Sequence, residues 1–230
     1  MNNLNDIIAN TPLFGGLSDE QLSQISGIAQ EKRFKRGQAI FWEGDPGIGF
    51  YVVVEGKIKV YKTSSEGKEQ ILHIYGPGHP FGEVPVFSGS RFPANAMAIE
   101  KSRMLFFPRQ DFVDLISKHP SLALNMLAVL SVRLRQFTVQ VENLSLKEVP
   151  ARLASYLLYL AQEQDSPDIV TLPISKGQLA SLLGTIPETL SRIFNKMTQQ
   201  DLIAVRGSKI SLIDPDGIDD LSVNGRLGER

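Results

Sequence analysis

Residues 175–199 read SKGQLASLLGTIPETLSRIFNKMTQ, and this stretch decides the fold of the C-terminal part of the chain. Ser175 with Gln178 three residues later forms a capping box, which predicts the start of a helix. Gly184 is the residue type that most readily adopts the left-handed backbone at a helix end. Pro187 fits the first turn of a second helix. Helix, glycine turn and helix together predict a helix-turn-helix.

The second helix of this motif has an apolar face and a polar face. Its apolar residues recur at helical spacing: Leu190, Ile193, Phe194 and Met197. Its polar residues have the same spacing on another face: Glu188, Ser191, Arg192 and Asn195. Arginine can donate two hydrogen bonds to guanine, glutamate accepts from cytosine, and serine and asparagine can do either. We therefore expect these four residues, the reading face, to contact DNA bases, although a solvated helix face has the same pattern.

A basic hairpin is predicted after this helix, over residues 202–213. Between residues 176 and 209 the chain has five basic and two acidic side chains, whereas its formal net charge as a whole is −1. This local excess favours contacts with phosphate despite the neutral total. The candidate phosphate-contacting residues are Lys176, Thr189, Lys196, Arg206 and Lys209.

The N-terminal half has a different pattern. From Phe34 to Arg109 short apolar runs alternate with glycine or proline, which predicts an all-β unit. Two strands are especially clear at residues 50–54 and 57–61, and a third is predicted at residues 70–75.

A long amphipathic helix is predicted to join the two halves, over residues 121–147. Its apolar residues, the seam, have heptad spacing: Leu127, Leu130, Leu134, Phe137, Val141 and Leu144, preceded by Ala123. Its opposite face carries polar residues that we expect to be hydrated: Arg133, Arg135, Gln136, Gln140 and Glu142. The seam predicts parallel self-association, and the alternative is packing on its own β unit alone. Pro150 breaks the helical pattern and marks a hinge.

The sequence therefore predicts an α+β fold with an N-terminal domain over residues 1–120, the helix, and a DNA-binding domain over residues 148–230. No cysteine is present, which excludes disulfides, thiolate metal sites and cysteine-ligated clusters. Neither a secretory signal nor a membrane-spanning run is recognisable, so we expect a cytoplasmic protein without a membrane partner. No catalytic constellation is apparent, and an enzyme is not expected.

Several motifs along the chain are shared with one known family. They are Leu13-Phe14 with Leu17-Ser18, residues 37–45 (GQAIFWEGD), residues 56–60 (GKIKV), Gly76-Pro77-Gly78 with Phe81-Gly82-Glu83, the long helix, and residues 187–192 (PETLSR). With these motifs the chain resembles the CRP/FNR family of transcription regulators over nearly its whole length. The resemblance implies a cyclic-nucleotide-binding-type β-roll, a dimerisation helix and a winged helix-turn-helix.

The resemblance also places an effector pocket in the β-roll. In cyclic-AMP-binding members an Arg-Ser or Arg-Thr pair follows the Phe-Gly-Glu turn and holds the cyclic phosphate. Phe92-Pro93 stands there in this chain, and proline lacks an N–H, so cyclic nucleotide binding is not favoured. The pocket residues, called the effector corner below, are Phe81, Gly82, Glu83, Arg91, Phe92, Pro93 and Ala94.

The absence of cysteine excludes the iron–sulfur cluster of an FNR-type oxygen sensor. What remains resembles the DNR and HcpR branches, which regulate nitric-oxide or nitrosative-stress responses and for which haem is the proposed effector. The resemblance thus implies haem b as a candidate cofactor. Residues able to ligate its iron are His73, His79, His119, Met97 and Met104, and each also fits an ordinary structural role.

The resemblance finally implies a homodimeric activator whose partners are double-stranded DNA, RNA polymerase and a small effector. The reading helix looks like the type whose Glu-x-x-Ser-Arg, here Glu188, Ser191 and Arg192, reads palindromic TTGAT-like sites. The rival interpretation is a regulatory cyclic-nucleotide-binding module of another system. Such a module would not need residues 175–213.

Overall fold

The computed structural model describes residues 4–9 and 11–225 and divides into two compact units. The first unit extends to residue 135 and the second begins at residue 136, so the division falls inside helix α5 (Pro120–Leu146). This helix nearly coincides with the predicted one over residues 121–147. The outermost residues of the two predicted domains, 1–3 and 226–230, lie outside the described residues.

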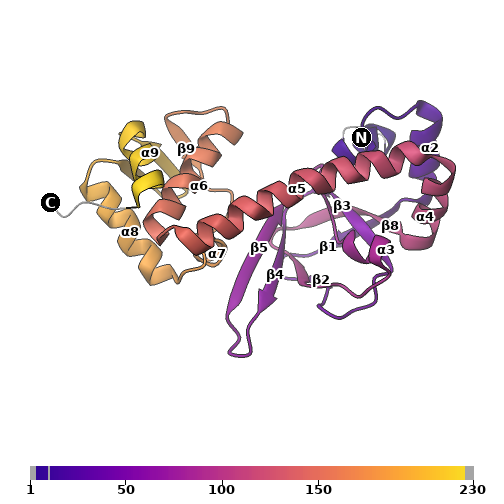
Figure 1. Cartoon of the computed structure of the whole chain (residues 1–230), viewed down its shortest axis with the longest axis horizontal. Coiled ribbons are helices and arrows are strands. Elements are labelled where there is room, and N and C mark those ends of the chain that lie inside the picture. The colour runs from indigo at the N-terminus through magenta and orange to yellow at the C-terminus, as the bar shows by residue number, and fades with distance from the viewer. Residues whose placement is uncertain (1–3, 10, 226–230) are drawn as a thin grey trace. The chain divides into compact units, whose positions relative to one another are not determined.

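The first unit contains a β-roll with helices before and after it (Figure 1). Its helices are α1 (Leu4–Ala9), the 3-10 turn η1 (Pro12–Phe14), α2 (Asp19–Ile28), α3 (Val84–Ser88) and α4 (Arg109–Lys118). Its strands are β1 (Gln30–Phe34), β2 (Ala39–Phe41), β3 (Gly49–Glu55), β4 (Ile58–Thr63), β5 (Glu69–Tyr75), β6 (Pro80–Phe81), β7 (Asn95–Ala98) and β8 (Ser102–Pro108). The all-β unit predicted from Phe34 to Arg109 is therefore confirmed except at residues 84–88, which form the short helix α3.

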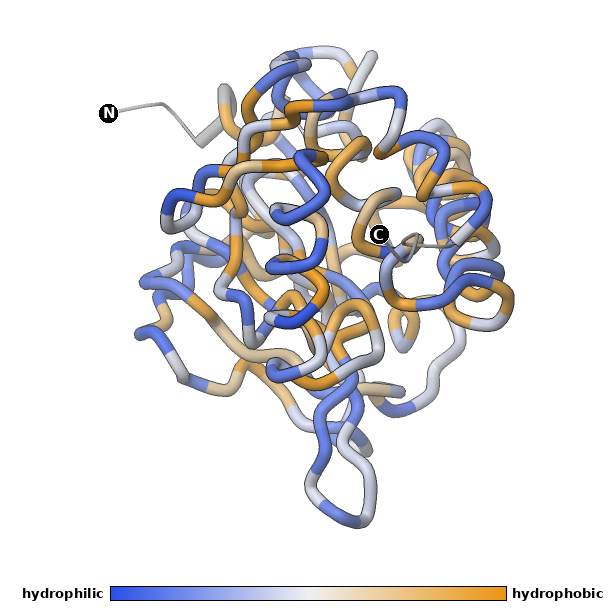
Figure 2. The backbone as a smooth tube through the Cα atoms, turned by 90° about the vertical axis from the view of Figure 1, so that its left-hand side faces the viewer, coloured by the Kyte–Doolittle hydropathy of each residue, from blue (hydrophilic) through white to orange (hydrophobic). Residues whose placement is uncertain are grey.

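Two antiparallel sheets make up the β-roll. One has the strand order β1-β8-β3-β6 and the other β2-β7-β4-β5. The tip of the β4–β5 hairpin projects from the roll and is hydrophilic (Figures 1 and 2). This turn is the one that the sequence predicts between the strands at residues 57–61 and 70–75.

The alternation of side chains along β3 and β8 builds two cores at once. Tyr51 and Val53, with Phe106 of β8, face the cluster between the two sheets. Phe50 and Val52 point the other way and pack with residues of α2, α4 and α5. Because successive side chains of a strand point to opposite faces, a strand that is apolar throughout must be buried on both sides.

Helix α5 keeps much of its apolar surface exposed. Its buried apolar residues, Leu122 and Met126, lie in its first turns and pack into the core under β3. By length and hydropathy α5 is also the one helix among the described residues that could cross a membrane, although the sequence pattern predicts none. A helix that pairs with a second helix has the same length and composition, so this property alone does not indicate a membrane protein.

After the end of α5, the described part of the second unit contains four helices and a small sheet. Its elements are α6 (Val149–Glu163), β9 (Ile169–Thr171), α7 (Lys176–Leu182), α8 (Pro187–Gln199), β10 (Ile203–Arg206), β11 (Lys209–Leu212) and α9 (Pro215–Asn224). The strands form an antiparallel sheet in the order β10-β11-β9. Pro150 lies in the first turn of α6, as predicted for the break after the long helix.

The segment after Asp214 is rich in aspartate, and residues 215–224 form helix α9, which packs against α6. Asp214 caps the helix by accepting a hydrogen bond from the backbone N–H of Gly217 at 2.9 Å. Ile218 and Leu221 are buried. Two apolar residues one turn apart are enough to dock a short helix, even when its other residues are acidic.

Candidate nucleic-acid interface and effector corner

The helix-turn-helix begins at the predicted capping box. The Ser175 hydroxyl accepts a hydrogen bond from the Gln178 backbone N–H at 3.2 Å, and the Gln178 side-chain oxygen accepts one from the Ser175 N–H at 3.0 Å. Helix α7 ends before Gly184, whose φ of +69° lies in the left-handed region. Pro187 then occupies the first turn of α8. Each of these local signals is confirmed.

Helix α8 is divided into two faces as its sequence predicts. Leu190, Ile193, Phe194 and Met197 are buried, and the reading face is exposed: Glu188, Ser191, Arg192 and Asn195. The Arg192 guanidinium donates a hydrogen bond to the Thr189 hydroxyl at 3.1 Å, one turn back along the helix. This contact restricts the arginine while leaving its remaining donors available for another acceptor.

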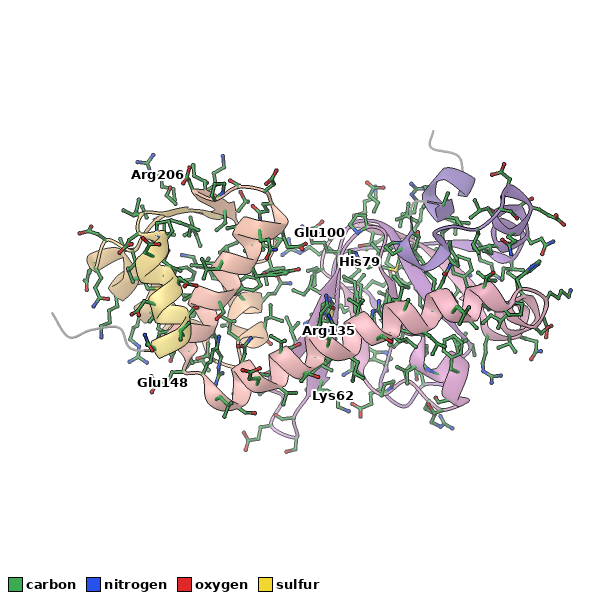
Figure 3. All side chains as sticks on the ribbon, turned by 45° about the horizontal axis from the view of Figure 1, so that its top comes forward. Lys62, His79, Glu100, Arg135, Glu148 and Arg206 are labelled. Atoms are coloured by element: carbon green, nitrogen blue, oxygen red, sulfur yellow. The ribbon has the colours of Figure 1, made fainter. Side chains whose placement is uncertain are left out.

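The candidate phosphate-contacting residues lie on α7, on α8 itself and on strands β10 and β11 beside their turn. Arg206 and Lys209 are exposed partners across the turn between β10 and β11, where Gly207 has a φ of +64°. The Arg206 side chain extends away from the second unit (Figure 3). The Lys176 ammonium lies 4.9 Å from the centre of the Phe194 ring, while Lys196 is exposed and Thr189 half-buried.

Arg152 of α6 contacts the ends of two other helices and was not singled out by its sequence pattern. Its guanidinium donates hydrogen bonds to the carbonyls of Leu144, Lys147 and Leu183, at 2.8 to 2.9 Å. The first two carbonyls lie at the end of α5 and the third at the end of α7. Arg152 therefore satisfies carbonyls that helix ends leave without partners, and it ties the reading motif to the end of the long helix.

In the first unit the effector corner is centred on a buried ion pair. The Glu83 carboxylate contacts the Arg133 guanidinium of α5, and Arg133 also donates to the carbonyl of Pro80. The two side chains are only 7% and 12% exposed. The Arg133 guanidinium lies 4.9 Å from the centre of the Tyr75 ring. The helical pattern predicts Arg133 on a hydrated face, and this prediction is wrong. The Arg133 side chain is instead directed into its own β-roll, where the Glu83 carboxylate neutralises its charge.

Aromatic rings fill the space beside this pair. Phe41 and Phe92 are stacked with ring centres 3.7 Å apart and planes 7° from parallel, and both are buried. Gly82 has a φ of +75°, and a Cβ there would lie 3.1 Å from the Phe41 ring. Only glycine suits both the backbone and the space at this position. Phe81 is buried in the same cluster, and Ala94 is also buried.

The other residues of the corner are held on its outer side. Arg91 is exposed and donates a hydrogen bond to the Gly44 carbonyl at 2.7 Å. Pro93 is exposed, and its carbonyl accepts a hydrogen bond from the Lys62 ammonium at 2.9 Å. The structure thus brings together Phe81, Gly82, Glu83 and Phe92, while Arg91 faces the loop that carries Gly44.

The histidines occupy different environments. Burial, with the positive charge of Arg133 and with His79, lowers the pKa of His73 to about 4. His119 has both ring nitrogens within hydrogen-bond distance of glutamines, Gln21 at 3.4 Å and Gln24 at 2.7 Å. His79 is exposed, and its Nδ1 lies 3.1 Å from the Pro77 carbonyl.

The two methionine candidates differ in exposure. Met104 is fully buried between the sheets, whereas Met97 is half-buried on β7. No cluster of three or more metal-ligating His, Asp or Glu side chains occurs in the described part of the chain, which also lacks cysteine.

The seam of α5 is largely exposed within one chain. Leu127, Leu134, Phe137 and Val141 are 59, 69, 41 and 62% exposed. Leu130 is half-buried and packs against the core of its own β-roll, and Leu144 is half-buried. A further exposed row, Val132, Val139 and Leu146, lies on the side that the pattern predicts to be polar.

A capped helix, a glycine turn, a second helix with an exposed polar face and a basic hairpin define a winged helix-turn-helix DNA-binding domain. The comparisons with known proteins agree with this class. A model of the Crp-like helix-turn-helix domain matches residues 151–221, and a model of the cyclic nucleotide-binding domain matches residues 31–119.

Similar proteins cover nearly the whole chain. The chain is 33% identical to the cyclic AMP receptor protein of Thermus thermophilus over 84% of its own length and 88% of that protein. It is 29% identical to the fumarate and nitrate reduction regulatory protein of Escherichia coli, over 91% of its own length and 86% of that protein. The solved structure of FixK2 from Bradyrhizobium japonicum has a TM-score of 0.76 at 25% identity, over 85% of this chain and 98% of FixK2. The chain belongs to the CRP/FNR family of transcription regulators.

Proposed function

We propose that the chain works as a homodimer in which two copies of α5 pair along the seam and two copies of α8 read a palindromic site. The observation that carries the proposal is the exposed apolar row along α5. Leaving such side chains in water is unfavourable by roughly 25 cal/mol for each Å². Heptad spacing is what a parallel helix pair requires, and a dimer of helix-turn-helix domains places its reading helices one DNA turn apart.

The DNA site follows from the reading face. Glu188, Ser191 and Arg192 match the Glu-x-x-Ser-Arg pattern that reads TTGAT-like half-sites, and all three side chains are exposed. The phosphate contacts come from the basic side chains around α8 and the β10–β11 turn. The protein acts in the cytoplasm as an activator, with RNA polymerase as its partner, in the response to nitrosative or redox stress.

The effector is haem b, which reaches the β-roll near its corner. Among the candidate ligands His79 fits best, because it is exposed and its hydrogen bonds to the carbonyls of Gly76 and Pro77 involve Nδ1 rather than Nε2. Both nitrogens of His119 have glutamine partners, and Met104 is fully buried. An absorption spectrum of the chain mixed with haem should show a Soret band that His79→Ala shifts or removes. An unchanged band in that variant would eliminate His79.

A cyclic nucleotide is the second candidate effector. It is favoured by the Glu83 carboxylate and Arg133 guanidinium, which form a polar pair in an otherwise aromatic corner, and by the cyclic AMP receptor protein among the relatives. Calorimetric titration with cyclic AMP tests it. Heat of binding in the native chain that disappears in Glu83→Gln would favour this effector over haem.

Sedimentation tests the dimer. Leu134→Glu with Phe137→Glu should convert the protein to monomers, because two buried charges at the centre of the seam would face their copies. Val132→Glu with Val139→Glu adds the same charges to the exposed row on the opposite side of α5 and should leave the dimer intact. A dimer that survives the first change, or is lost only with the second, would contradict the seam.

A further inference from the structure

A cavity on the outside of the β-roll has an unusual concentration of positive charge. It measures about 680 Å³ and lies where β1, the turn after it and the start of β8 meet. Its lining residues are Arg33, Phe34, Lys35, Arg36, Gln38, Glu55, Lys101, Ser102 and Arg103. Five of these nine side chains are cationic and one is anionic. The cavity, called the basic pocket below, shares no residue with the effector corner.

Two of the arginines are held opposite one another by the strand register. Arg33 of β1 pairs directly with Arg103 of β8, and like charges in such a pair are destabilising. Glu31 offsets part of this repulsion, since its carboxylate lies 2.8 Å from Arg33 and 3.5 Å from Arg103. Its contacts with both arginines lower the pKa of Glu31. The two guanidinium groups are therefore fixed side by side at the rim of the pocket.

The remaining cations of the pocket have no carboxylate partner among the residues that the structure describes. Lys35, Arg36 and Lys101 are exposed and form no ion pair within the described residues. Lys35 and Arg36 lie in a rigid turn, because the Gln38 side chain accepts a hydrogen bond from the Lys35 N–H at 2.9 Å. The Gly37 N–H also donates to the Ala98 carbonyl at 2.8 Å. Three positive charges without a counterion in the described part of the chain, two of them in a turn held by hydrogen bonds, therefore line the pocket.

Charged residues on an edge strand can simply prevent pairing with another sheet, and β1 is an edge strand. That role does not account for Lys35, Arg36 and Lys101, which lie outside the strands and line the same cavity. The volume is within the range of pockets that enclose a small molecule. Guanidinium groups grip phosphate through two parallel hydrogen bonds, and clustered lysines supply further charge.

We propose that the basic pocket binds a small molecule carrying two or more phosphate groups, at a site separate from the effector corner. The ligand's phosphates lie against the arginine pair and the Lys35–Arg36 turn, with Lys101 closing the opposite side. Phe34, half-buried at the base of the turn, offers an apolar surface to the rest of the ligand.

Calorimetric titration of the full chain with inorganic triphosphate and with ATP tests the proposal. Both probes should bind with one site per chain, and tighter binding of ATP would show that the nucleoside also makes contact. Lys35→Gln with Arg36→Gln should weaken binding of either probe by roughly tenfold or more, since each charge-assisted hydrogen bond is worth about that factor. Lys101→Gln should weaken it in the same direction.

Two charge-matched controls locate the effect. Lys68→Gln with Lys118→Gln removes two exposed cations elsewhere on the first unit and should leave the affinity unchanged. Arg206→Gln with Lys209→Gln should do the same while weakening DNA binding. No binding to the native chain, equal binding by the pocket variant, or an equal loss in either control would overturn the proposal. Transcription lost in the pocket variant, with no triphosphate binding in the native chain, would assign the surface to an acidic protein partner instead.

Discussion

The reading face of α8 and the effector corner of the β-roll both contain a glutamate and an arginine, but in opposite environments. Glu188 and Arg192 are exposed, and no ion pair joins them in the described structure. Glu83 and Arg133 are buried and paired with each other. The first pair is ready to contact an external partner, whereas the second can accept one only by giving up its own contact.

Breaking the buried pair should have the largest effect on stability. Glu83→Gln leaves the Arg133 charge buried without its counterion, and we expect the free energy of unfolding to fall by about 3–5 kcal/mol. Glu188→Gln, the matched change on the reading face, should alter it by less than about 0.5 kcal/mol. Urea denaturation of both variants measures the difference. Equal small losses in the two variants would show that the Glu83–Arg133 ion pair does not stabilise the effector corner.

The buried histidine near the same corner predicts a pH dependence. His73 has a pKa of about 4 in the folded chain, below the ordinary value of 6.5, so the unfolded chain binds its proton first as the pH falls. The free energy of unfolding should therefore fall by roughly 3 kcal/mol in total as the pH is lowered from 6.5 to 4, because only the unfolded chain is protonated at His73 in this range. Unfolding free energies measured across this range should fall more steeply for the native chain than for His73→Gln. Parallel curves would contradict the assignment.

On the DNA-binding side, Arg192→Ala should weaken binding to the specific site by about 1–3 kcal/mol and relax the preference at one base pair. Arg206→Ala should instead weaken binding to all sequences alike and reduce the salt dependence by about one phosphate contact. Mobility-shift titrations on a set of single-base variants distinguish the two. A uniform loss for Arg192→Ala would remove it from the base-reading residues.

The smallest expected effect compares identical capping boxes in the two units. Ser18 with Gln21 caps α2 as Ser175 with Gln178 caps α7. Alanine at either serine should cost about 1 kcal/mol of stability. Only Ser175→Ala should also weaken DNA binding, because only α7 supports the reading helix. Loss of DNA affinity in Ser18→Ala as well would mean that general stability, and not the position of α8, limits binding.

The same contrast explains what could be predicted from the sequence. The helix-turn-helix depends on signals a few residues apart, such as Ser175 with Gln178, Gly184 and Pro187, and its elements and faces were all predictable. The corner depends on Glu83 and Arg133, which are 50 residues apart in the chain. The helical pattern places Arg133 on a polar face, and both its burial and its partner could only be identified in the folded structure.

The sequence pattern also fails to predict some of the helices. Helices α1, α2 and α4 are six to ten residues long, and α9 is embedded among aspartates. Such helices form because a few apolar side chains dock on a core built by other segments. Their amphipathic periodicity is too short to recognise in isolation.

The most direct test of the dimeric reader is the stoichiometry and affinity of the chain on a palindrome of TTGAT half-sites. With half-site centres about one helical turn apart, sedimentation and mobility shift should show two chains on each duplex. Insertion of about 5 base pairs at the centre turns one half-site to the other side of the DNA and should abolish cooperative binding. One chain per duplex, or equal affinity for the two spacings, would contradict the account.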